Sequence, residues 1–262
     1  MSPTNSETPA LETRSLCLSF GGLRATDDVS FSVAQGSVTA LIGPNGAGKT
    51  TVFNLVTNLF PAQSGEVYFH GARIDGLAPV RIAELGLIRT FQTARVFPGM
   101  TVRENLLVGR HRMISHGPLA QALRLAAVRR EEASLVARAD TLLELVGLAR
   151  FSAVHATELP MGAQKLLEVL RALMAQPRLL LLDEPAAGLN DTETAELAAL
   201  LLAIRATGIT VLVVEHNMSL VMGVADQIVV LDAGAVIARG SPVEIQRNAR
   251  VIEAYLGQEV AP

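Results

Sequence analysis

The chain has 262 residues, half of them hydrophobic, and a formal net charge of -3 at pH 7. That length and apolar content allow one large α/β domain, or a core domain with a smaller one appended. Because basic residues are not in excess, the composition argues against nucleic acid as a main partner. The only cysteine is Cys17, which excludes an internal disulfide and suits a reducing cytoplasm. No apolar run approaches the ~18 residues of a membrane span, so we expect any membrane role to be peripheral.

The first part of the chain alternates polar and apolar character in a way that favours β structure. Residues 1–11 are polar and lack the basic start and apolar block of a secretory signal, so they predict a short disordered lead. Residues 13–35 predict two short strands around Gly21-Gly22, and residues 66–73 predict a hairpin-like stretch. We therefore expect β structure on both sides of the segment that lies between them.

That segment contains Gly43-Pro-Asn-Gly-Ala-Gly-Lys-Thr50, a phosphate-binding loop. It follows an apolar run at 38–42, which predicts a buried strand, and precedes a predicted helix at 51–59. The glycines let successive backbone N–H groups face a polyphosphate, and the helix N-terminus adds a positive dipole. Lys49 supplies a point charge for the β and γ phosphates, and Thr50 offers a hydroxyl to Mg2+. The residues predicted to bind nucleotide here are Gly43, Pro44, Asn45, Gly46, Ala47, Gly48, Lys49, Thr50 and Thr51.

An ordinary glycine-rich turn is the competing interpretation of this loop. The strand before it and the helix after it favour phosphate binding, because the motif requires that context. The lysine usage points the same way. Lys49 and Lys165 are the only lysines of the chain, so lysine is kept where a compact ammonium must enter a phosphate cage.

After Gln92 the pattern becomes helical. Thr101-Val-Arg-Glu104 is a capping box ahead of a short helix, and helical patterns run through residues 119–146 and 164–174. Because strand patterns return afterwards, we expect a helical subdomain inserted between core strands.

The last third of the chain returns to an α/β pattern. Apolar runs at 179–182 and 210–214 predict parallel strands buried on both faces. Asn190 to Glu193 has the capping-box pattern for a helix between them. Residues 228–238 predict a hairpin, and Ser241-Pro-Val-Glu244 predicts a capped helix start.

The predicted strand at 179–182 ends in Asp183 and Glu184, at the edge where open α/β sheets bind ligands. Phosphoryl transfer needs a bound Mg2+ and a polarised water, so Asp183 suits the metal shell and Glu184 suits the general base. Such a pair can also be merely solvated or cap a helix. The phosphate loop in the same chain favours the catalytic interpretation.

With Asp183-Glu184-Pro185 added to the phosphate loop, the chain resembles the ATP-binding cassette (ABC) family of transport ATPases, from about Thr13 to Gly257. The resemblance implies ATP and Mg2+ as cofactors and ATP hydrolysis coupled to transmembrane transport. The implied fold class is α/β, a P-loop NTPase core with a mainly parallel sheet, an antiparallel β subdomain and an inserted helical subdomain. The core is expected at 12–92 and 176–262, and the helical subdomain at about 93–175.

The resemblance assigns roles to further residues. Gln92 matches the glutamine loop, which contacts Mg2+ and the attacking water, and His216 matches the switch histidine at the γ-phosphate. Phe20 stands at the position of the aromatic residue that stacks on adenine. Asn190 replaces the usual aspartate of the D-loop. Taken alone, Gln92 and Phe20 would be a surface amide and a core ring, whereas a Glu-His pair ending a buried strand places His216 beside Asp183 and Glu184.

The segment at the place of the family signature departs from the usual pattern. Pro160 stands where the family carries a serine whose hydroxyl holds the γ-phosphate of ATP on the opposite subunit, and proline offers neither hydroxyl nor N–H. Gly162 and the following helix start can still present N–H groups to that ATP. The competing interpretation is a plain helix lead-in. We hypothesise an asymmetric pair of subunits, in which the site containing Lys49 is the better catalytic site.

Two features resemble the ATPase subunit of branched-chain amino-acid importers. They are an arginine-rich insertion at 109–132 and the closing segment at 248–257. The insertion can instead be a solvated helix face or a surface for membrane subunits and acidic lipids. Val96, Phe97 and Met100 are better candidates for contact with a coupling helix.

The implied partners are a second ABC ATPase subunit, in a heterodimer or a homodimer, and two transmembrane permease subunits. An extracytoplasmic substrate-binding protein takes part indirectly, and no nucleic acid is expected. The implied location is the cytoplasm, peripheral on the inner face of the cell membrane. The ATPase of a lipid or lipopolysaccharide exporter is the nearest alternative, followed by a non-transport ABC ATPase. The transported substrate rests on the resemblance alone.

Overall fold

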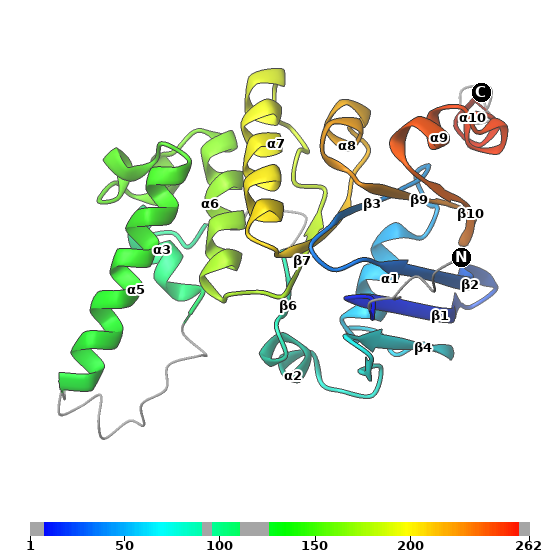
Figure 1. Ribbon diagram of the computed structural model, residues 1–262, viewed down its shortest axis with the longest axis horizontal. Coiled ribbons are helices and arrows are strands. Elements are labelled where there is room, and N and C mark those ends of the chain that lie inside the picture. Colours follow the sequence, from blue (N-terminus) through cyan, green and yellow to red (C-terminus); the bar gives the residue numbers. More distant parts are fainter. Residues whose placement is uncertain (1–7, 91–95, 111–125, 257–262) are drawn as a thin grey trace, which may run out of the picture. The chain divides into compact units, whose positions relative to one another are not determined.

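The computed structural model describes residues 8–90, 96–110 and 126–256 (Figure 1). The chain divides into two compact units. The core unit comprises Met1–Arg89, Arg178–Ala187 and Ala198–Pro262. The helical unit comprises Thr90–Pro177 and Gly188–Leu197.

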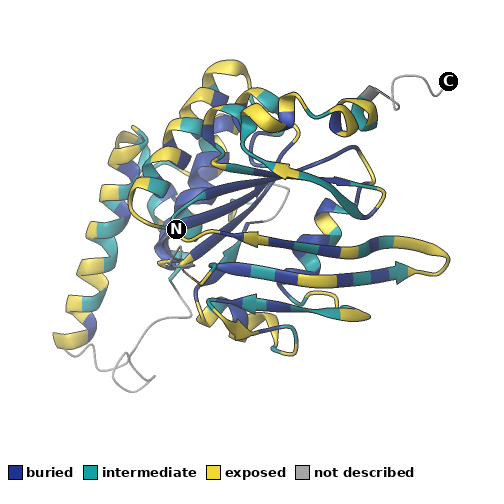
Figure 2. Cartoon of the chain, turned by 45° about the vertical axis from the view of Figure 1, so that its right-hand side comes forward, coloured by how far each residue is buried: buried dark blue, intermediate teal, exposed yellow. Residues whose placement is uncertain are grey.

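The core unit contains a six-stranded sheet with the strand order β10-β9-β3-β8-β7-β6. Its strands are β3 (Val38–Ile42), β6 (Leu87–Arg89), β7 (Leu179–Asp183), β8 (Thr210–Val214), β9 (Gln227–Asp232) and β10 (Ala235–Gly240). Neighbouring strands are parallel except β9 and β10, which form an antiparallel hairpin. Every residue of β3, β7 and β8 is buried (Figure 2), which confirms the strands predicted from continuous apolar runs.

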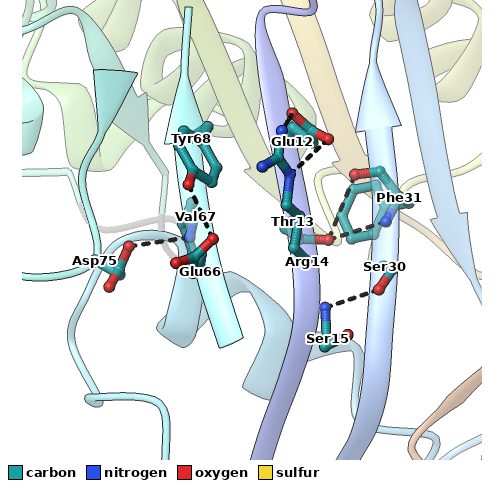
Figure 3. Close-up of polar contacts among 10 residues, drawn as sticks. All are labelled: Glu12, Thr13, Arg14, Ser15, Ser30, Phe31, Glu66, Val67, Tyr68 and Asp75. Carbon is teal, nitrogen blue, oxygen red and sulfur yellow. Dashed lines mark hydrogen bonds and ion pairs between the residues drawn. The ribbon is translucent and has the colours of Figure 1, made fainter. Parts of the chain in front are cut away.

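The second sheet of the core unit is antiparallel, in the order β2-β1-β4-β5. Its strands are β1 (Leu11–Phe20), β2 (Leu23–Val33), β4 (Ser64–Phe69) and β5 (Ala72–Arg73). Side chains tie β1 to β2 (Figure 3), because the N–H of Phe31 donates to Oγ1 of Thr13 at 3.0 Å and that of Ser15 donates to Oγ of Ser30 at 2.7 Å. The strand pair around Gly21-Gly22 and the later hairpin are confirmed, and the pair is longer than predicted.

The start of β1 corrects the prediction of a disordered lead over residues 1–11. The strand begins at Leu11, and both Ala10 and Leu11 are fully buried. The N–H of Ala10 donates to the carbonyl of Val33 at 2.9 Å, and the N–H of His70 donates to the carbonyl of Ala10 at 3.0 Å. The prediction is therefore wrong for these two residues, because long-range pairing buries a segment of polar local composition. Residues 1–7 lie outside the described part of the chain.

Helix α1 (Lys49–Val56) follows the glycine-rich loop and lies beside β2 (Figure 1). Its Phe53 belongs to a hydrophobic cluster that includes Leu41 of β3 and Leu181 of β7. Complete burial of Phe53 contributes about 1.5–3 kcal/mol. This packing fixes α1, and with it the loop at the N-terminus of the helix.

Three helices pack together in the helical unit among the described residues: α3 (Val102–Val108), α5 (Ala126–Leu145) and α6 (Met161–Met174). Short 3-10 turns, η2 (Ala149–Phe151) and η3 (Ala156–Glu158), lead from α5 to α6. The capping box before α3 is confirmed, because Oγ1 of Thr101 accepts the N–H of Glu104 and the Glu104 carboxylate accepts the N–H of Thr101. The part of the predicted helix at 119–146 that precedes α5 lies outside the described residues.

The remaining helices are α2 (Pro79–Glu84), α7 (Asp191–Ala206), α8 (Met218–Val224), α9 (Pro242–Gln246) and α10 (Ala249–Leu256). The predicted cap of α7 is confirmed, because Asn190 and Glu193 exchange backbone-to-side-chain hydrogen bonds of 3.0 Å in both directions. Ser241 and Glu244 form the predicted capping box before α9. Among the described residues, none of the helices is long and apolar enough to cross a membrane.

Candidate functional site

The loop between β3 and α1 depends on glycines that no other residue can replace without strain. Gly43 has a φ of 153°, and a Cβ there would lie 2.1 Å from the carbonyl oxygen of Leu231. Gly48 has a φ of 96°, and a Cβ there would lie 2.4 Å from the carbonyl oxygen of Ala25. Both approaches are closer than any real Cβ contact, so glycine is required by the backbone path and by the neighbouring strands.

Lys49 is the first residue of α1 and is only 8 % exposed. Its ammonium donates to the carbonyl oxygens of Gly43 at 2.7 Å and of Pro44 at 2.9 Å. Burial lowers the pKa of Lys49, and the negative charges of Glu184 and Asp183 act in the opposite direction. The lysine is thus held by the carbonyls of the loop, near the carboxylates of Asp183, which ends β7, and Glu184, which follows it.

A pocket of about 420 Å3 opens over this loop within the core unit. Its lining residues are Phe20, Leu23, Arg24, Ala25, Asn45, Gly46, Ala47, Gly48, Lys49, Thr50, Thr51, Glu184 and Ala233. Of the loop residues predicted to bind nucleotide, Gly43 and Pro44 do not line the pocket but are buried and accept the hydrogen bonds from Lys49. The volume falls within the range of small-ligand sites.

Phe20, one of the pocket-lining residues, packs against a second aromatic ring. Phe20, the last residue of β1, is 50 % exposed, and the exposed ring of Phe60 packs edge-on against it with ring centroids 5.8 Å apart. The structure therefore brings Phe20 together with the phosphate loop and leaves much of its ring accessible. Because Phe60 packs edge-on against it and leaves much of it accessible, the Phe20 ring can stack on a planar base.

Asp183 and Glu184 follow each other at the end of β7, yet their surroundings differ. Asp183 is 2 % exposed; its Oδ2 accepts a hydrogen bond of 2.8 Å from Arg89, and its buried Oδ1 has no hydrogen-bond partner among the described residues. Glu184 adopts a φ of 49°, and its N–H donates to the carbonyl of Val214 at 2.9 Å. This left-handed turn redirects the chain as Glu184 joins the pocket lining.

Arg89 is a site residue that the sequence motifs did not indicate. It ends β6, its side chain is 9 % exposed, and its guanidinium also donates to Oδ1 of Asn54 at 2.7 Å. The same guanidinium lies 5.4 Å from the ring centroid of Phe53. Arg89 thus links α1 to Asp183. An arginine at the end of an apolar strand is the signal that could have pointed to it.

His216 and Glu215 come from the end of β8, which pairs with β7 so that Val214 stands opposite Asp183. His216 is exposed, whereas Glu215 is fully buried. The carboxylate of Glu215 accepts N–H groups from Ala186 at 2.6 Å, from His216 at 3.0 Å and from Asn217 at 3.1 Å. Sequence reasoning treated Glu215 only as the polar neighbour of His216 and did not identify these bonds.

Pro160 and Gly162 are not among the described residues that line this pocket. Gln92 lies outside the described residues. Pro160 is the N-cap residue of α6 and Gly162 is buried, both within the helical unit. A Cβ at Gly162 would lie 2.4 Å from Oε1 of Glu193, so the glycine accommodates the side chain that caps α7.

The sequence of this chain matches known families and proteins that bind ATP, in agreement with the phosphate loop and pocket described above. Residues 26–187 match the family model for the ABC transporter, and residues 235–261 match that of the branched-chain amino acid ATP-binding cassette transporter. The chain is 45% identical over 251 residues to the high-affinity branched-chain amino acid transport ATP-binding protein BraF of Pseudomonas aeruginosa, covering 95% of this chain and 98% of that protein. It is 42% identical to LivG of Escherichia coli, with the same coverage.

Solved structures show the same likeness. An ATP-binding cassette of an ABC transporter in its ADP conformation superimposes with a TM-score of 0.83 at 35% identity, covering 95% of this chain and 99% of that one. A nucleotide-free ATP-binding cassette gives a TM-score of 0.81 at 35% identity, covering 94% and 98%. The predicted α/β cassette fold is confirmed. The chain belongs to the ABC transporter family, among its branched-chain amino acid ATP-binding cassettes.

Proposed function

We propose that the chain is the ATP-hydrolysing subunit of a branched-chain amino-acid importer and drives transport through separate membrane subunits. The observation that carries the proposal is the core-unit pocket, where the phosphate loop, Lys49, Phe20 and Glu184 share one lining. The names of the relatives, which are branched-chain amino acid transport ATP-binding proteins, support the substrate class.

Two parts of the pocket lining hold ATP: the aromatic ring of Phe20 and the phosphate loop. Phe20 stacks on adenine, and the N–H groups of residues 45–51 bind the phosphates. Lys49 places its ammonium on the β and γ phosphates, which offer it acceptors in place of the carbonyls of Gly43 and Pro44. The apolar part of the nucleotide and its charged part thus have separate sets of contacts.

The donors of the site fit Mg2+, which prefers oxygen ligands and keeps several waters and phosphate oxygens around it. Asp183 carries a buried carboxylate oxygen, Oδ1, without a hydrogen-bond partner in the described part of the chain. We assign this oxygen, the hydroxyl of Thr50 and the amide of Gln92 to the metal shell. Bound Mg2+ supplies charge neutralisation at the β and γ phosphates.

Hydrolysis requires a water aligned with the γ-phosphorus. Glu184 lines the pocket and serves as the general base, accepting the proton of the water as its oxygen attacks phosphorus. The bond between the γ-phosphorus and the bridging oxygen breaks, and ADP leaves. His216 donates to the γ-phosphate and thereby senses whether the phosphate is present. Glu184, His216, Gln92 and Lys49 form the catalytic set.

A second cassette subunit completes each site in this proposal. Gly162 and the start of α6 present N–H groups to ATP held by the partner, where Pro160 supplies neither hydroxyl nor N–H. We therefore propose a heterodimer in which the pocket containing Lys49 is the more active of the two sites.

The contact with two transmembrane permease subunits is proposed for the loop before α3. Phe97 and Met100 are 41 % and 37 % exposed there. Asn105 is fully buried and holds the loop, because its Oδ1 accepts the N–H of Phe97 at 2.7 Å and its amide donates to the carbonyl of Met100 at 3.4 Å. The buried Asn105 fixes the backbone of the loop, and the exposed apolar side chains of Phe97 and Met100 suit contact with the permease subunits. An extracytoplasmic binding protein delivers the amino acid to those subunits.

Co-purification tests this proposal. A tagged copy of the chain, expressed in its own cells and solubilised in mild detergent, is expected to bring with it two membrane subunits and a second cassette. The associated binding protein should bind leucine, isoleucine or valine by calorimetry. Recovery of a lipid-export bridge in place of these subunits would contradict the importer assignment and leave the ATPase assignment standing.

A further inference from the structure

Glu215 is a buried carboxylate that the proposed mechanism does not use. It directly follows β8, and its exposed fraction is 0%. Its two oxygens divide between two chain segments: Oε1 accepts the N–H of Ala186 at 2.6 Å, and Oε2 accepts the N–H groups of His216 at 3.0 Å and Asn217 at 3.1 Å. All four residues belong to the core unit.

These two segments carry the proposed general base and the proposed γ-phosphate sensor. Ala186 follows Glu184 by two residues, across the left-handed turn at Glu184 and across Pro185. His216 adjoins Glu215, and Asn217 caps α8 by accepting the N–H of Leu220 at 3.1 Å. The register between β7 and β8 ends at the pair Asp183 and Val214, and one further backbone bond, from the N–H of Glu184 to the carbonyl of Val214 at 2.9 Å, reaches Glu184. Glu215 adds bonds to Ala186 and to His216, which lie beyond that point on each segment.

We infer that Glu215 is a positioning residue that fixes the distance between Glu184 and His216 by holding the backbone of both segments. The inference rests on the roles proposed above for those two residues. A charged acceptor with three N–H donors forms shorter and stronger bonds than a neutral one, and full burial removes competing water. Glu215 itself does not touch nucleotide; it acts through the backbone.

The substitution Glu215→Gln tests this directly, because it keeps size and shape but replaces one acceptor oxygen with an N–H2 donor. The amide can accept from Ala186 or from His216 and Asn217, but not from both sides. One segment is then released, and misplacement by about 1 Å can cost on the order of 100-fold in rate. We expect kcat of the assembled complex to fall roughly 10- to 100-fold while KM for ATP and the affinity for a fluorescent ATP analogue stay within about twofold.

Asp226 provides a matched control. Its carboxylate accepts the N–H of Val38 at 2.9 Å, at the start of β3 and at the opposite end of the strand from the phosphate loop. Asp226→Asn disturbs a carboxylate-to-backbone bond beside the same sheet, at an exposed carboxylate that also pairs with Arg205 at 2.7 Å. We expect it to leave kcat unchanged, which separates a positioning effect from general loosening of the core unit.

Parallel assays separate this inference from the proposed function. If Glu184→Gln abolishes turnover and Glu215→Gln retains the wild-type kcat, the positioning role is overturned and the ATPase assignment stands. If Glu184→Gln retains turnover, the assignment of the base itself fails. If Glu215→Gln does not fold, amide hydrogen exchange in the wild-type complex tests the inference instead. The N–H groups of Ala186, His216 and Asn217 should exchange slowly and together. Rapid exchange at Ala186 would overturn the inference.

Discussion

Arg89 and Asp183 form an ion pair in the interior of the core unit, with Nη2 of Arg89 2.8 Å from Oδ2 of Asp183 and the side chains only 9% and 1% exposed. The pair occupies one oxygen of the carboxylate and leaves the other, Oδ1, for a different ligand. This division allows Asp183 to be fixed in place and to keep one oxygen for the Mg2+ that we propose it binds.

Removal of Arg89 should therefore destabilise the fold. Arg89→Gln leaves a buried carboxylate without its cation, which typically costs about 3–5 kcal/mol. Urea unfolding of the purified chain measures this change. Arg73→Gln is the matched control, because Arg73 pairs with Glu66 and Asp75 on an exposed face, and it should unfold at nearly the wild-type midpoint. Equal midpoints for the two variants would show that the buried pair does not stabilise the core.

The glycine requirement of the phosphate loop gives a second prediction. Gly48→Ala places a Cβ 2.4 Å from the carbonyl oxygen of Ala25 at a φ of 96°, so the loop must distort. We expect the Kd for ATP to rise at least about tenfold, the effect of 1.4 kcal/mol. Gly76→Ala meets no atom within 4 Å and should bind ATP as the wild type does. Calorimetry with both variants checks this, and unaltered affinity in Gly48→Ala would refute the required geometry.

Phe20 should contribute to binding through adenine alone. Phe20→Ala removes the exposed ring in the pocket lining, and loss of one base-stacking contact typically costs about 1–3 kcal/mol. The affinity for ATP should fall by about 5- to 150-fold, whereas the affinity for tripolyphosphate, which has no base, should not change. Phe60→Ala removes only the edge support and should have a smaller effect. A parallel loss of ATP and tripolyphosphate affinity would mean that Phe20 supports the loop and not the base.

Pro160 predicts unequal ATP sites in the proposed heterodimer. Glu184→Gln should remove most of the ATP turnover, and the same change at the matching glutamate of the partner subunit should remove much less. Pro160→Ser restores a hydroxyl at the start of α6 and should raise turnover at the partner's site. Steady-state phosphate release from the two single variants measures the difference. Equal losses would show that the two sites work alike despite Pro160.

Local chemistry made much of the fold predictable. The strands β3, β7 and β8 are continuous apolar runs, and the caps at Thr101 and Ser241 depend on residues three positions apart. These patterns involve residues that are close together in the chain, so they can be recognised from the sequence alone.

The features that sequence patterns did not predict depend on distant partners. Arg89 meets Asp183, which is 94 positions away, and Glu215 meets Ala186, which is 29 positions away. Ala10 and Leu11 are buried through pairing with Val33 and Phe69 on β2 and β4. No local pattern encodes such contacts, because they exist only once the sheets have formed.

ATP-driven leucine uptake tests the central claim most directly. The complex of this chain with its membrane and cassette partners is reconstituted in vesicles, with the binding protein and radiolabelled leucine on one side and ATP with Mg2+ on the other. We predict uptake that requires ATP and is lost in Glu184→Gln, although that variant still binds ATP. Uptake that continues in Glu184→Gln, or no leucine uptake by a complex that hydrolyses ATP, would contradict the account.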